Sequence, residues 1–149
     1  MKKIALLCIL GLTLASAEIL KPAKWSFEGP KVKSKVGDTV TLTFIAKIEK
    51  NWYLYSSELK VEGPTPTEIT FTPNASYQTI GKIQAINPKV KHDDIWGGNV
   101  HYFIKEARFT QKVKILKPNA VIEGKINCQT CTDTDGKCIP IKEKFKFEL

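Results

Sequence analysis

Apolar and polar residues alternate along most of this chain, and that alternation constrains its fold more than any other feature. Every second residue is apolar between positions 40 and 48, and the same period of two recurs at 107–115 and 144–149. Successive side chains of a strand point to opposite faces of a sheet, so this pattern predicts strands with one buried face. After the first 17 residues, no stretch of the sequence shows the sustained 3.6-residue repeat of an amphipathic helix.

Shorter runs of the same kind are separated by turn-forming sequences. The runs lie at 52–56, 68–72, 77–83, 100–104 and 121–128. The turns include Gly37-Asp38, Lys50-Asn51, Asn87-Pro88, Gly97-Gly98, Pro118-Asn119 and Asp135-Gly136. About eight short strands in about 130 residues are typical of an antiparallel sandwich. We therefore predict a single all-β domain, an immunoglobulin-like antiparallel β-sandwich.

The first 17 residues differ from the rest of the chain. Two lysines precede an apolar run at positions 4–14, and small residues follow at 15–17. This arrangement predicts a cleaved secretory signal peptide at 1–17 and a mature domain at 18–149. The apolar run is shorter than the roughly 20 residues of a spanning helix, so we expect no stable membrane insertion. The expected location is the periplasm or the extracellular space, where disulfides form and persist.

The chain is basic, with a formal net charge of +8 at pH 7. Its 23 basic residues include a single arginine, Arg108, and are scattered among acidic residues. Nucleic-acid binding uses clustered basic side chains, often with interleaved aromatics, and the sequence has no such run. We expect no nucleic-acid partner, and interpret the charge as a solvated surface.

The three cysteines that follow the predicted leader all lie between 128 and 138. Cys128 and Cys131 form a Cys-x-x-Cys motif, which in thioredoxins begins a helix. No helical pattern follows here. On a continuous strand the two Cα atoms would be about 10 Å apart with side chains on opposite faces, too far for a disulfide. Cys128 would then face inward as a small buried hydrophobe.

Cys131 and Cys138 flank the turn signal Asp135-Gly136, which would bring their sulfurs within reach. Two interpretations stay open from the residues alone: a structural staple of the hairpin, and a redox-active pair. A loop of about eight residues gains only about 2.5 kcal/mol from a disulfide, which a sandwich with its own core does not require. A zinc site built from the cysteines with His92 or His101 is a third alternative. The acidic hairpin and the oxidising compartment argue against it, and we expect no metal or cofactor.

Several motifs follow one another in a recognisable order between Trp25 and Leu149. They are Asn51-Trp52-Tyr53-Leu54-Tyr55-Ser56, then Gly63-Pro64 with Pro66-Thr67, then Phe109-Thr110-Gln111-Lys112-Val113, then Gly-x-x-x-Cys-Gln-x-Cys at 124–131, and finally a second cysteine and a terminal Phe-x-Phe-x-Leu strand. Each motif alone is weak, but the ordered set is specific. In this order they resemble the family of amino-terminal periplasmic domains of the thiol:disulfide interchange protein DsbD, the disulfide bond corrector domains.

This resemblance implies an immunoglobulin-like sandwich whose activity is dithiol–disulfide exchange. Electrons would come from a membrane-embedded thiol transporter and pass to periplasmic thioredoxin-like proteins, including those of cytochrome c maturation, or to disulfide isomerases. By motif position the redox pair would be Cys131 and Cys138. We favour Cys138 as the attacking sulfur, because Lys137 lies beside it while Asp133 lies near Cys131.

The family also carries a cap loop that shields the disulfide from stray oxidants. By position, that loop would be Asp93, Asp94, Ile95 and Trp96, with Tyr53 and Tyr55 lining the site. A carboxylate beside a thiol raises its pKa and can move protons during exchange. Without the resemblance, two adjacent aspartates would be typical of a solvated loop.

The sequence departs from the family pattern at two positions. Cys128 stands where the family has tyrosine and adds a third thiol, while Ile141 replaces a second proline. The chain also carries neither the membrane span nor the thioredoxin domain of its relatives, so we expect it to exchange electrons with separate proteins. The alternative is an exported, non-catalytic binding or adaptor module whose disulfide is purely structural.

Overall fold

The computed structural model describes residues 20–94 and 96–149. The predicted signal peptide at 1–17 and the predicted cap residue Ile95 lie outside these residues. The described chain folds into strands and turns without a helix. Accordingly, none of its segments is a helix long and apolar enough to cross a membrane.

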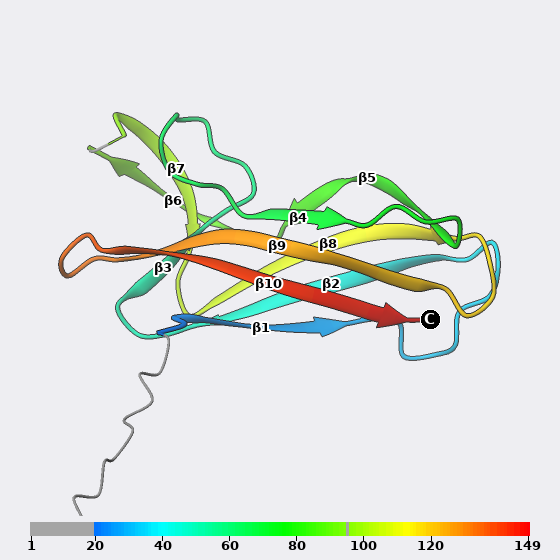
Figure 1. Cartoon of the computed structure of the whole chain (residues 1–149). Coiled ribbons are helices and arrows are strands. Elements are labelled where there is room, and N and C mark those ends of the chain that lie inside the picture. Colours follow the sequence, from blue (N-terminus) through cyan, green and yellow to red (C-terminus); the bar gives the residue numbers. More distant parts are fainter. Residues whose placement is uncertain (1–19, 95) are drawn as a thin grey trace, which may run out of the picture.

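Two antiparallel sheets pack face to face (Figure 1). The first sheet has the order β1 (Ala23–Glu28), β2 (Thr39–Ile48), β8 (Glu106–Ile115) and β5 (Tyr77–Ala85). The second has the order β10 (Cys138–Glu148), β9 (Val121–Thr132), β3 (Trp52–Tyr55), β7 (Gly98–Phe103) and β6 (Lys89–Asp93), with β4 (Glu68–Phe71) also paired to β9. The predicted all-β, immunoglobulin-like sandwich is confirmed.

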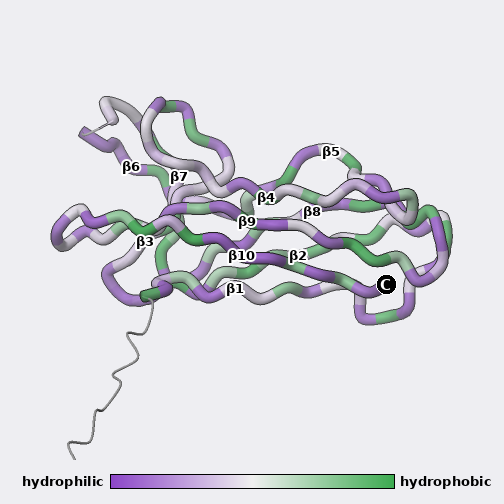
Figure 2. The backbone as a smooth tube through the Cα atoms, in the orientation of Figure 1, coloured by the Kyte–Doolittle hydropathy of each residue, from purple (hydrophilic) through white to green (hydrophobic). Residues whose placement is uncertain are grey.

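The main core lies between the two sheets and is built from the alternating residues of the sequence. Leu42, Phe44 and Ala46 of β2 are fully buried, and so are Ala107 and Phe109 of β8. Figure 2 shows the same alternation as hydrophobic and hydrophilic positions that succeed each other along the strands. The inward faces predicted for these strands are therefore confirmed.

Phe44 stands at the centre of this core. Its ring contacts four other phenylalanine rings, the nearest being that of Phe145 at a centroid distance of 5.0 Å. The others, at 5.6 to 6.0 Å, are Phe27, Phe71 and Phe147. All four pairs meet edge to face, the arrangement that the aromatic quadrupole favours. This cluster joins β1, β2, β4 and β10 across the sandwich.

The sequence pattern misplaced some strand boundaries. It did not predict β1 or β6, and it ended β9 at residue 128 and began the last strand near 144. β6 has the sequence Lys-Val-Lys-His-Asp, which has no apolar face of its own. It is a strand because it pairs with β7, and its own sequence gives no signal for this. The end of β9 at the hairpin, residues 129–132, is rich in polar residues, and the start of β10, residues 138–141, is apolar at most positions without alternation, so the period of two gives no signal there.

A second, smaller layer covers the outer face of the second sheet at one end. β9 pairs with β4 through its middle, at residues 124–127, and with β3 through its last residues, at 130–132. The β6–β7 hairpin and the segment between β3 and β4 lie at the same end as the β9–β10 turn (Figure 1). Between them is an outer cluster whose buried members are Tyr53, Tyr55, Val100 and Cys131, with Leu59, Val61, Tyr102 and Ile104 packed against them.

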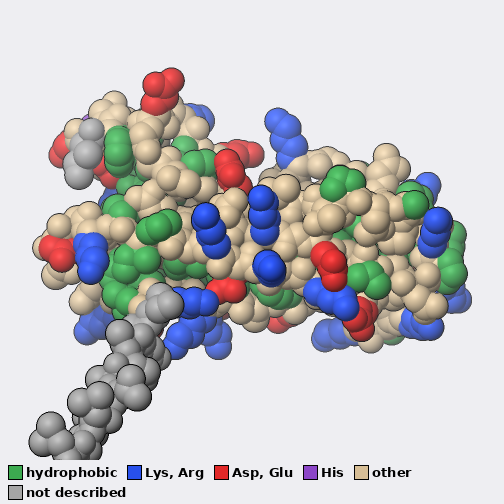
Figure 3. Space-filling view, in the orientation of Figure 1, with side chains coloured by type: hydrophobic (Ala, Val, Ile, Leu, Met, Phe, Trp, Pro, Cys, Tyr) green, Lys and Arg blue, Asp and Glu red, His purple; other side chains and the backbone are tan. Residues whose placement is uncertain are grey.

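The basic side chains do not form one continuous patch on the face seen in Figure 3, because acidic residues lie between them. The three surface pairs that join lysine or arginine to glutamate are Lys21–Glu143, Arg108–Glu106 and Lys146–Glu148 among the residues described. Exposed pairs of this kind contribute little to stability. The fold therefore depends on its apolar core rather than on its surface charges.

Replacing Phe44 with alanine tests the role of the aromatic cluster. We expect the free energy of unfolding to fall by about 3–5 kcal/mol, because the substitution leaves a cavity against four other rings. Urea unfolding followed by circular dichroism measures the loss. Thr41→Ala, at an exposed position of the same strand, should change stability by no more than about 0.5 kcal/mol. Equal losses in the two variants would contradict the central position of Phe44.

Candidate functional site

A disulfide joins Cys131 at the end of β9 to Cys138 at the start of β10. The two residues are direct cross-strand partners, with Cα atoms 4.1 Å apart. Thr132 N–H donates to the Lys137 carbonyl at 3.0 Å, so the neighbouring pair is the hydrogen-bonded one. The cysteines thus occupy a non-hydrogen-bonded pair, where side chains of antiparallel strands come closest. Of the two pairings weighed from the sequence, the structure contains the one across the turn.

The turn between the two cysteines is shaped by local side chains. Gly136 has a φ of 70°, a left-handed conformation that glycine adopts without steric cost. The Asp135 carboxylate accepts a hydrogen bond from the Lys137 N–H at 3.1 Å, and Thr132 Oγ1 accepts one from the Thr134 N–H at 3.1 Å. The Asp-Gly signal in the sequence therefore does form the reversal that brings the sulfurs together.

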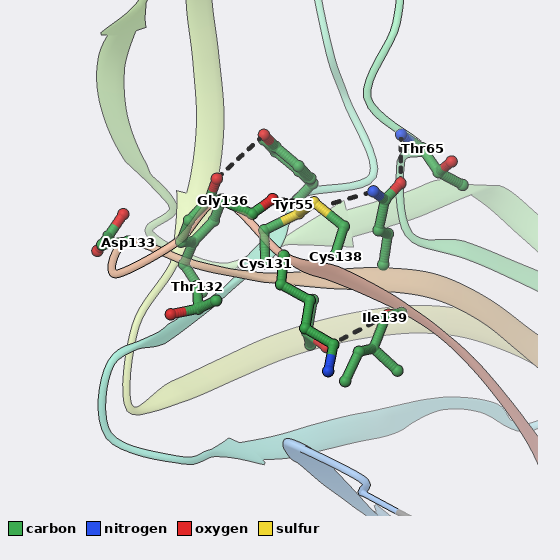
Figure 4. The surroundings of a disulfide bond; sticks show 12 residues. Tyr55, Thr65, Cys131, Thr132, Asp133, Gly136, Cys138 and Ile139 are labelled. Carbon is green, nitrogen blue, oxygen red and sulfur yellow. Dashed lines mark hydrogen bonds between the residues drawn. A yellow bond between two sulfur atoms is a disulfide. The ribbon is translucent and has the colours of Figure 1, made fainter.

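The two sulfur-bearing residues have very different exposure. Cys131 is fully buried in the outer cluster, with Tyr53 as its cross-strand neighbour on β3. Cys138 is an exposed residue at the start of β10. Figure 4 shows the bond between them with Tyr55 on one side and Thr65 on the other. A reagent from solution therefore reaches the Cys138 sulfur before the Cys131 sulfur.

Tyr53 and Tyr55 both project from the outer face of β3, as expected for residues two apart on a strand. Their hydroxyl oxygens are 3.4 Å apart and their rings meet edge to face at 5.3 Å. Burial, the hydrogen bond with Tyr55, and the negative charges of Asp93 and Asp133 all raise the pKa of Tyr53. Its phenol is therefore neutral at physiological pH.

Three of the residues predicted as a cap loop, Asp93, Asp94 and Trp96, lie at the tip of the β6–β7 hairpin. Asp93 is the last residue of β6 and is nearly buried, and its carboxylate accepts a hydrogen bond from the Trp96 N–H at 3.4 Å. The Trp96 indole N–H donates to the Tyr55 hydroxyl at 3.3 Å. Asp94 instead points into solvent beside His92. The structure therefore places Asp93 and Trp96 on the tyrosine pair and leaves Asp94 outside it.

Gly63, in the segment between β3 and β4, accommodates the Trp96 ring. Its φ is 125°, and a Cβ atom built on it would overlap the indole. The Gly63-Pro64 motif thus has a steric explanation that the sequence alone did not supply. Glycine at this position lets the segment approach the tip of the cap hairpin.

Lys91 of β6 is a site residue that the sequence reasoning missed. Its ammonium lies 4.1 Å from the centre of the Tyr53 ring and 5.1 Å from that of Tyr102, in cation–π geometry. It also lies 3.7 Å from the Asp133 carboxylate. Lys91 therefore connects the β6–β7 hairpin to the β9–β10 turn. No pattern in the sequence indicates this contact, because β6 and the β9–β10 turn are far apart along the chain and are brought together only by the pairing of strands in the sheet.

Between these two hairpins lies an open cleft of about 300 Å³. It is lined by Tyr53, Lys91, His92, Asp93, Asp94, Thr132, Asp133 and Gly136. Among the described residues, no group of three or more histidine, cysteine, aspartate or glutamate side chains is placed to hold a metal ion. The cleft is polar at its rim and borders the turn that carries the disulfide.

Gln129 is a second residue for which the sequence analysis gave no role. Its Nε2 lies 3.6 Å from the Cys131 sulfur, and its Oε1 accepts a hydrogen bond from the Thr65 N–H at 3.3 Å. It belongs to the Gln-x-Cys part of the motif at 124–131, so the signal was present but unassigned.

Cys128 is the free thiol among the described residues and lies on the inner face of β9, as predicted. Burial raises the pKa of its thiol to about 12, and the negative charge of Glu143 acts in the same direction. The Trp25 N–H dipole lowers this pKa, but its indole nitrogen makes no well-formed hydrogen bond within the described part of the chain, so burial dominates. Cys128 is therefore a protonated core residue and not part of the outer cluster.

The family model for the N-terminal part of the thiol:disulfide interchange protein DsbD matches residues 17–148. A comparison with curated protein sequences gives no significant match.

Solved structures with the same fold include three similar chains. The reduced DsbD N-terminal domain of Neisseria meningitidis is 17% identical with a TM-score of 0.51, over 76% of this chain and 79% of that one. The N-terminal periplasmic domain of ScsB from Proteus mirabilis is 20% identical with a TM-score of 0.63, over 87% of this chain and 47% of that one. A complex between the DsbD and PilB N-terminal domains of Neisseria meningitidis matches at 15% identity and a TM-score of 0.52, over 82% of this chain and 80% of that one.

Substituting Lys91 with glutamine tests the contact between the two hairpins. We expect the free energy of unfolding to fall by about 0.5–1.5 kcal/mol, because a cation–π contact and a partly exposed ion pair are lost together. Lys89→Gln is the matched control, since Lys89 is an exposed lysine on the same strand with no ion pair or ring contact among the residues described. Urea unfolding compares the variants, and equal losses would contradict the contact.

A second prediction concerns the pH dependence of stability at Cys128. The thiol ionises near pH 9 in an unfolded chain but near pH 12 in the fold, so the unfolded chain loses its proton first as the pH rises. The stabilisation is complete below pH 9 and is lost between about pH 9 and 12. Cys128→Val, which has no thiol, should therefore lose less stability than the wild type between pH 8 and 10.5 in urea unfolding. Parallel losses in the two proteins would contradict the raised pKa.

Proposed function

The chain belongs to the family of DsbD N-terminal domains, and on this premise we propose that it is an exported thiol:disulfide exchange domain that works through Cys131 and Cys138. The observation that supports the proposal most strongly is the unequal exposure of the two sulfur-bearing residues. A disulfide that only pins a hairpin needs no covering layer. Here one sulfur is accessible to a partner, while the other is held beneath tyrosine rings and the cap hairpin.

The exchange would proceed through a mixed disulfide at Cys138. A thiolate of a reducing partner attacks the Cys138 sulfur, the partner–Cys138 bond forms, and the Cys131–Cys138 bond breaks with its electron pair left on Cys131. A second thiolate of the partner then attacks the partner's own sulfur in the mixed disulfide and releases Cys138. The partner leaves as a disulfide, and the domain holds two electrons and, at neutral pH, up to two protons.

The reduced domain would pass these electrons on by the reverse sequence. The Cys138 thiolate attacks the disulfide of an oxidised protein, and Cys131 then resolves the mixed disulfide by attacking the Cys138 sulfur. This assigns attack to Cys138 because that residue is the exposed one and Lys137 lies beside it. Cys131 acts as the resolving sulfur because it is buried.

The cap hairpin and the tyrosine pair would protect the buried sulfur between encounters. Trp96 is hydrogen-bonded to Tyr55, and Asp93 holds the Trp96 backbone. This second layer excludes water and oxidants from Cys131, which a dithiol crossing an oxidising compartment requires. We assign Asp93, Trp96, Tyr53 and Tyr55 to the site lining, and we keep Asp94 and Ile95 in the proposed cap by their position in the sequence.

We propose periplasmic thioredoxin-like or disulfide isomerase proteins as recipients and a membrane thiol transporter as the electron donor. Family membership supports this, as does the complex in which a DsbD N-terminal domain of Neisseria meningitidis is bound to a PilB N-terminal domain. The location we propose is the periplasm. The signal peptide at 1–17 would direct export and then be cleaved. The ScsB domain with the same fold is itself periplasmic by its description.

Single cysteine variants test the proposed roles. Cys131→Ala leaves an exposed sulfur without a resolving partner. It should therefore trap a mixed disulfide with a thioredoxin whose resolving cysteine is replaced and whose attacking cysteine carries a thionitrobenzoate disulfide, because the Cys138 thiolate attacks the thioredoxin sulfur and thionitrobenzoate leaves with the electron pair. Cys138→Ala should trap at least about ten-fold less, because its remaining thiol at 131 is buried. Non-reducing gels and intact mass spectrometry measure the adducts. Equal trapping by both variants would overturn the assignment of Cys138 as the attacking sulfur.

The reduction potential distinguishes exchange from a structural bond. An exchanging disulfide should be more oxidising than about −300 mV, whereas a structural one lies below that value. Equilibration with glutathione or dithiothreitol buffers, followed by alkylation and mass spectrometry, gives the potential. A value below −300 mV would favour the non-catalytic adaptor instead.

A further inference from the structure

The buried sulfur of the disulfide receives a hydrogen bond from a side chain on its own strand. Gln129 Nε2 lies 3.6 Å from the Cys131 sulfur. We propose that Gln129 is a catalytic residue of the exchange reaction, whose carboxamide N–H stabilises the negative charge that develops on Cys131 when the bond to Cys138 breaks. The proposal rests on the proposed function and assigns a role within that same site.

The need for such a donor follows from the surroundings of Cys131. The residue is fully buried, so no water shell is available to a thiolate formed there. Burial away from water raises the pKa of a thiol and makes it a poorer leaving group. Without a donor, cleavage of the disulfide would place a desolvated charge among tyrosine rings.

The charged groups near the site do not replace this donor. Asp133 of the turn and Asp93 of β6 both act as negative charges on Tyr53, the cross-strand neighbour of Cys131, and would disfavour a thiolate. Lys91 is the nearby cation, but its ammonium is already shared between Asp133 and the Tyr53 ring. The hydroxyl groups of Tyr53 and Tyr55 bind each other, and Tyr55 also accepts from Trp96.

The orientation of the Gln129 carboxamide is fixed by the rest of its network. Its Oε1 accepts from the Thr65 N–H at 3.3 Å, so its Nε2 must face the sulfur. The reversed amide would set two N–H groups against each other. Thr65 is itself held between Pro64 and Pro66, whose rings restrict the backbone on both sides. Pro64 is buried, which anchors this donor to the outer layer.

The strand geometry also places Gln129 correctly. Residues 129 and 131 are two apart on β9 and share its outer face, so the Gln129 carboxamide lies beside the Cys131 sulfur. The cross-strand partner of Gln129 is Pro140, whose side chain has no polar group to compete for the amide. The Gln-x-Cys spacing and the opposing proline thus leave the N–H to the sulfur.

The hydrogen bond becomes stronger as the reaction proceeds. At 3.6 Å a disulfide sulfur is a weak acceptor, but the same N–H meets a full negative charge once the electron pair arrives on Cys131. Hydrogen bonds to ionised acceptors are roughly twice as strong as those between neutral groups. An interaction that is stronger in the transition state than before it lowers the barrier. The same donor serves the reverse step, in which Cys131 begins as the thiolate.

Kinetics of the full chain test the proposal. We expect Gln129→Leu to slow reduction of the Cys131–Cys138 disulfide by thioredoxin, and by dithiothreitol as a small probe, by about ten-fold, since a hydrogen bond to a charged leaving group is lost. Asn127→Leu is the matched control: it removes a carboxamide from the same face of β9, two residues earlier, and should slow the reaction less than about two-fold. Circular dichroism and urea unfolding show whether each variant is folded.

A second measurement reports on the sulfur itself. In a Cys138→Ala background, the acid dissociation constant of the Cys131 thiol can be followed by NMR of a ¹³C-labelled Cys131 Cβ atom. It should fall about ten-fold with Gln129→Leu and further with Gln129→Glu, whose carboxylate keeps the shape but repels a thiolate. Asn127→Leu should leave it unchanged.

The outcomes separate this inference from the proposed function. If the wild type exchanges with thioredoxin but Gln129→Leu matches Asn127→Leu in both rate and thiol acidity, the role of Gln129 is overturned. If the wild type itself does not exchange, the proposed function fails, while the change in thiol acidity still decides whether Gln129 donates to Cys131. If Gln129→Leu does not fold, Gln129→Glu takes its place. A rate equal to that of the wild type overturns the role of Gln129, and a slowing greater than the ten-fold expected for Gln129→Leu supports it.

Discussion

The rest of the structure depends on β9, a strand that must satisfy two hydrophobic layers at once. Its inner face contributes Ile122, Ile126 and Cys128 to the main core, while its outer face ends at Cys131 beneath a second cluster. A strand with one face in solvent would leave a disulfide at its end open on both sides. β3, the segment after it and the β6–β7 hairpin cover the outer face. The β9–β10 hairpin can therefore keep the Cys131 sulfur buried while Cys138 stays exposed to solvent.

This division of faces also explains why the three thiols behave differently. Cys128 and Cys131 are three apart on one strand and therefore belong to different layers. Burial between the sheets keeps Cys128 protonated, and the sheet lies between it and the disulfide. A third thiol beside a redox pair would be a hazard if it shared the same face. Here the alternation of side chains along β9 places Cys128 on the opposite face from Cys131, and this alone keeps Cys128 away from the exchange reaction.

Sequence patterning predicted the sandwich well and the site only in part. Alternation identified the inner faces of β2 and β8, and the Asp135-Gly136 turn gave the pairing of Cys131 with Cys138 its geometry. The contacts of Lys91 and Gln129 could not be read from the sequence. Each depends on segments that are distant along the chain, β6 against the turn in one case and the β3–β4 segment against β9 in the other. A single sequence carries no record of which polar side chains meet across strands that are not neighbours in the chain.

The side chains of the outer cluster determine how a negative charge on Cys131 can be stabilised. Its aromatic rings exclude water, and the nearby acidic groups oppose negative charge, so a thiolate could be stabilised there only by a fixed cation or by an oriented neutral donor. A neutral amide interacts weakly with the intact disulfide and strongly once negative charge has formed on the sulfur. Lys91, paired with Asp133 and lying over Tyr53, contributes to holding the two hairpins together. Negative charge on Cys131 must then be stabilised by backbone or amide dipoles. Within the described residues, the only such dipole placed on the buried sulfur is the carboxamide of Gln129, which the proline-flanked segment orients.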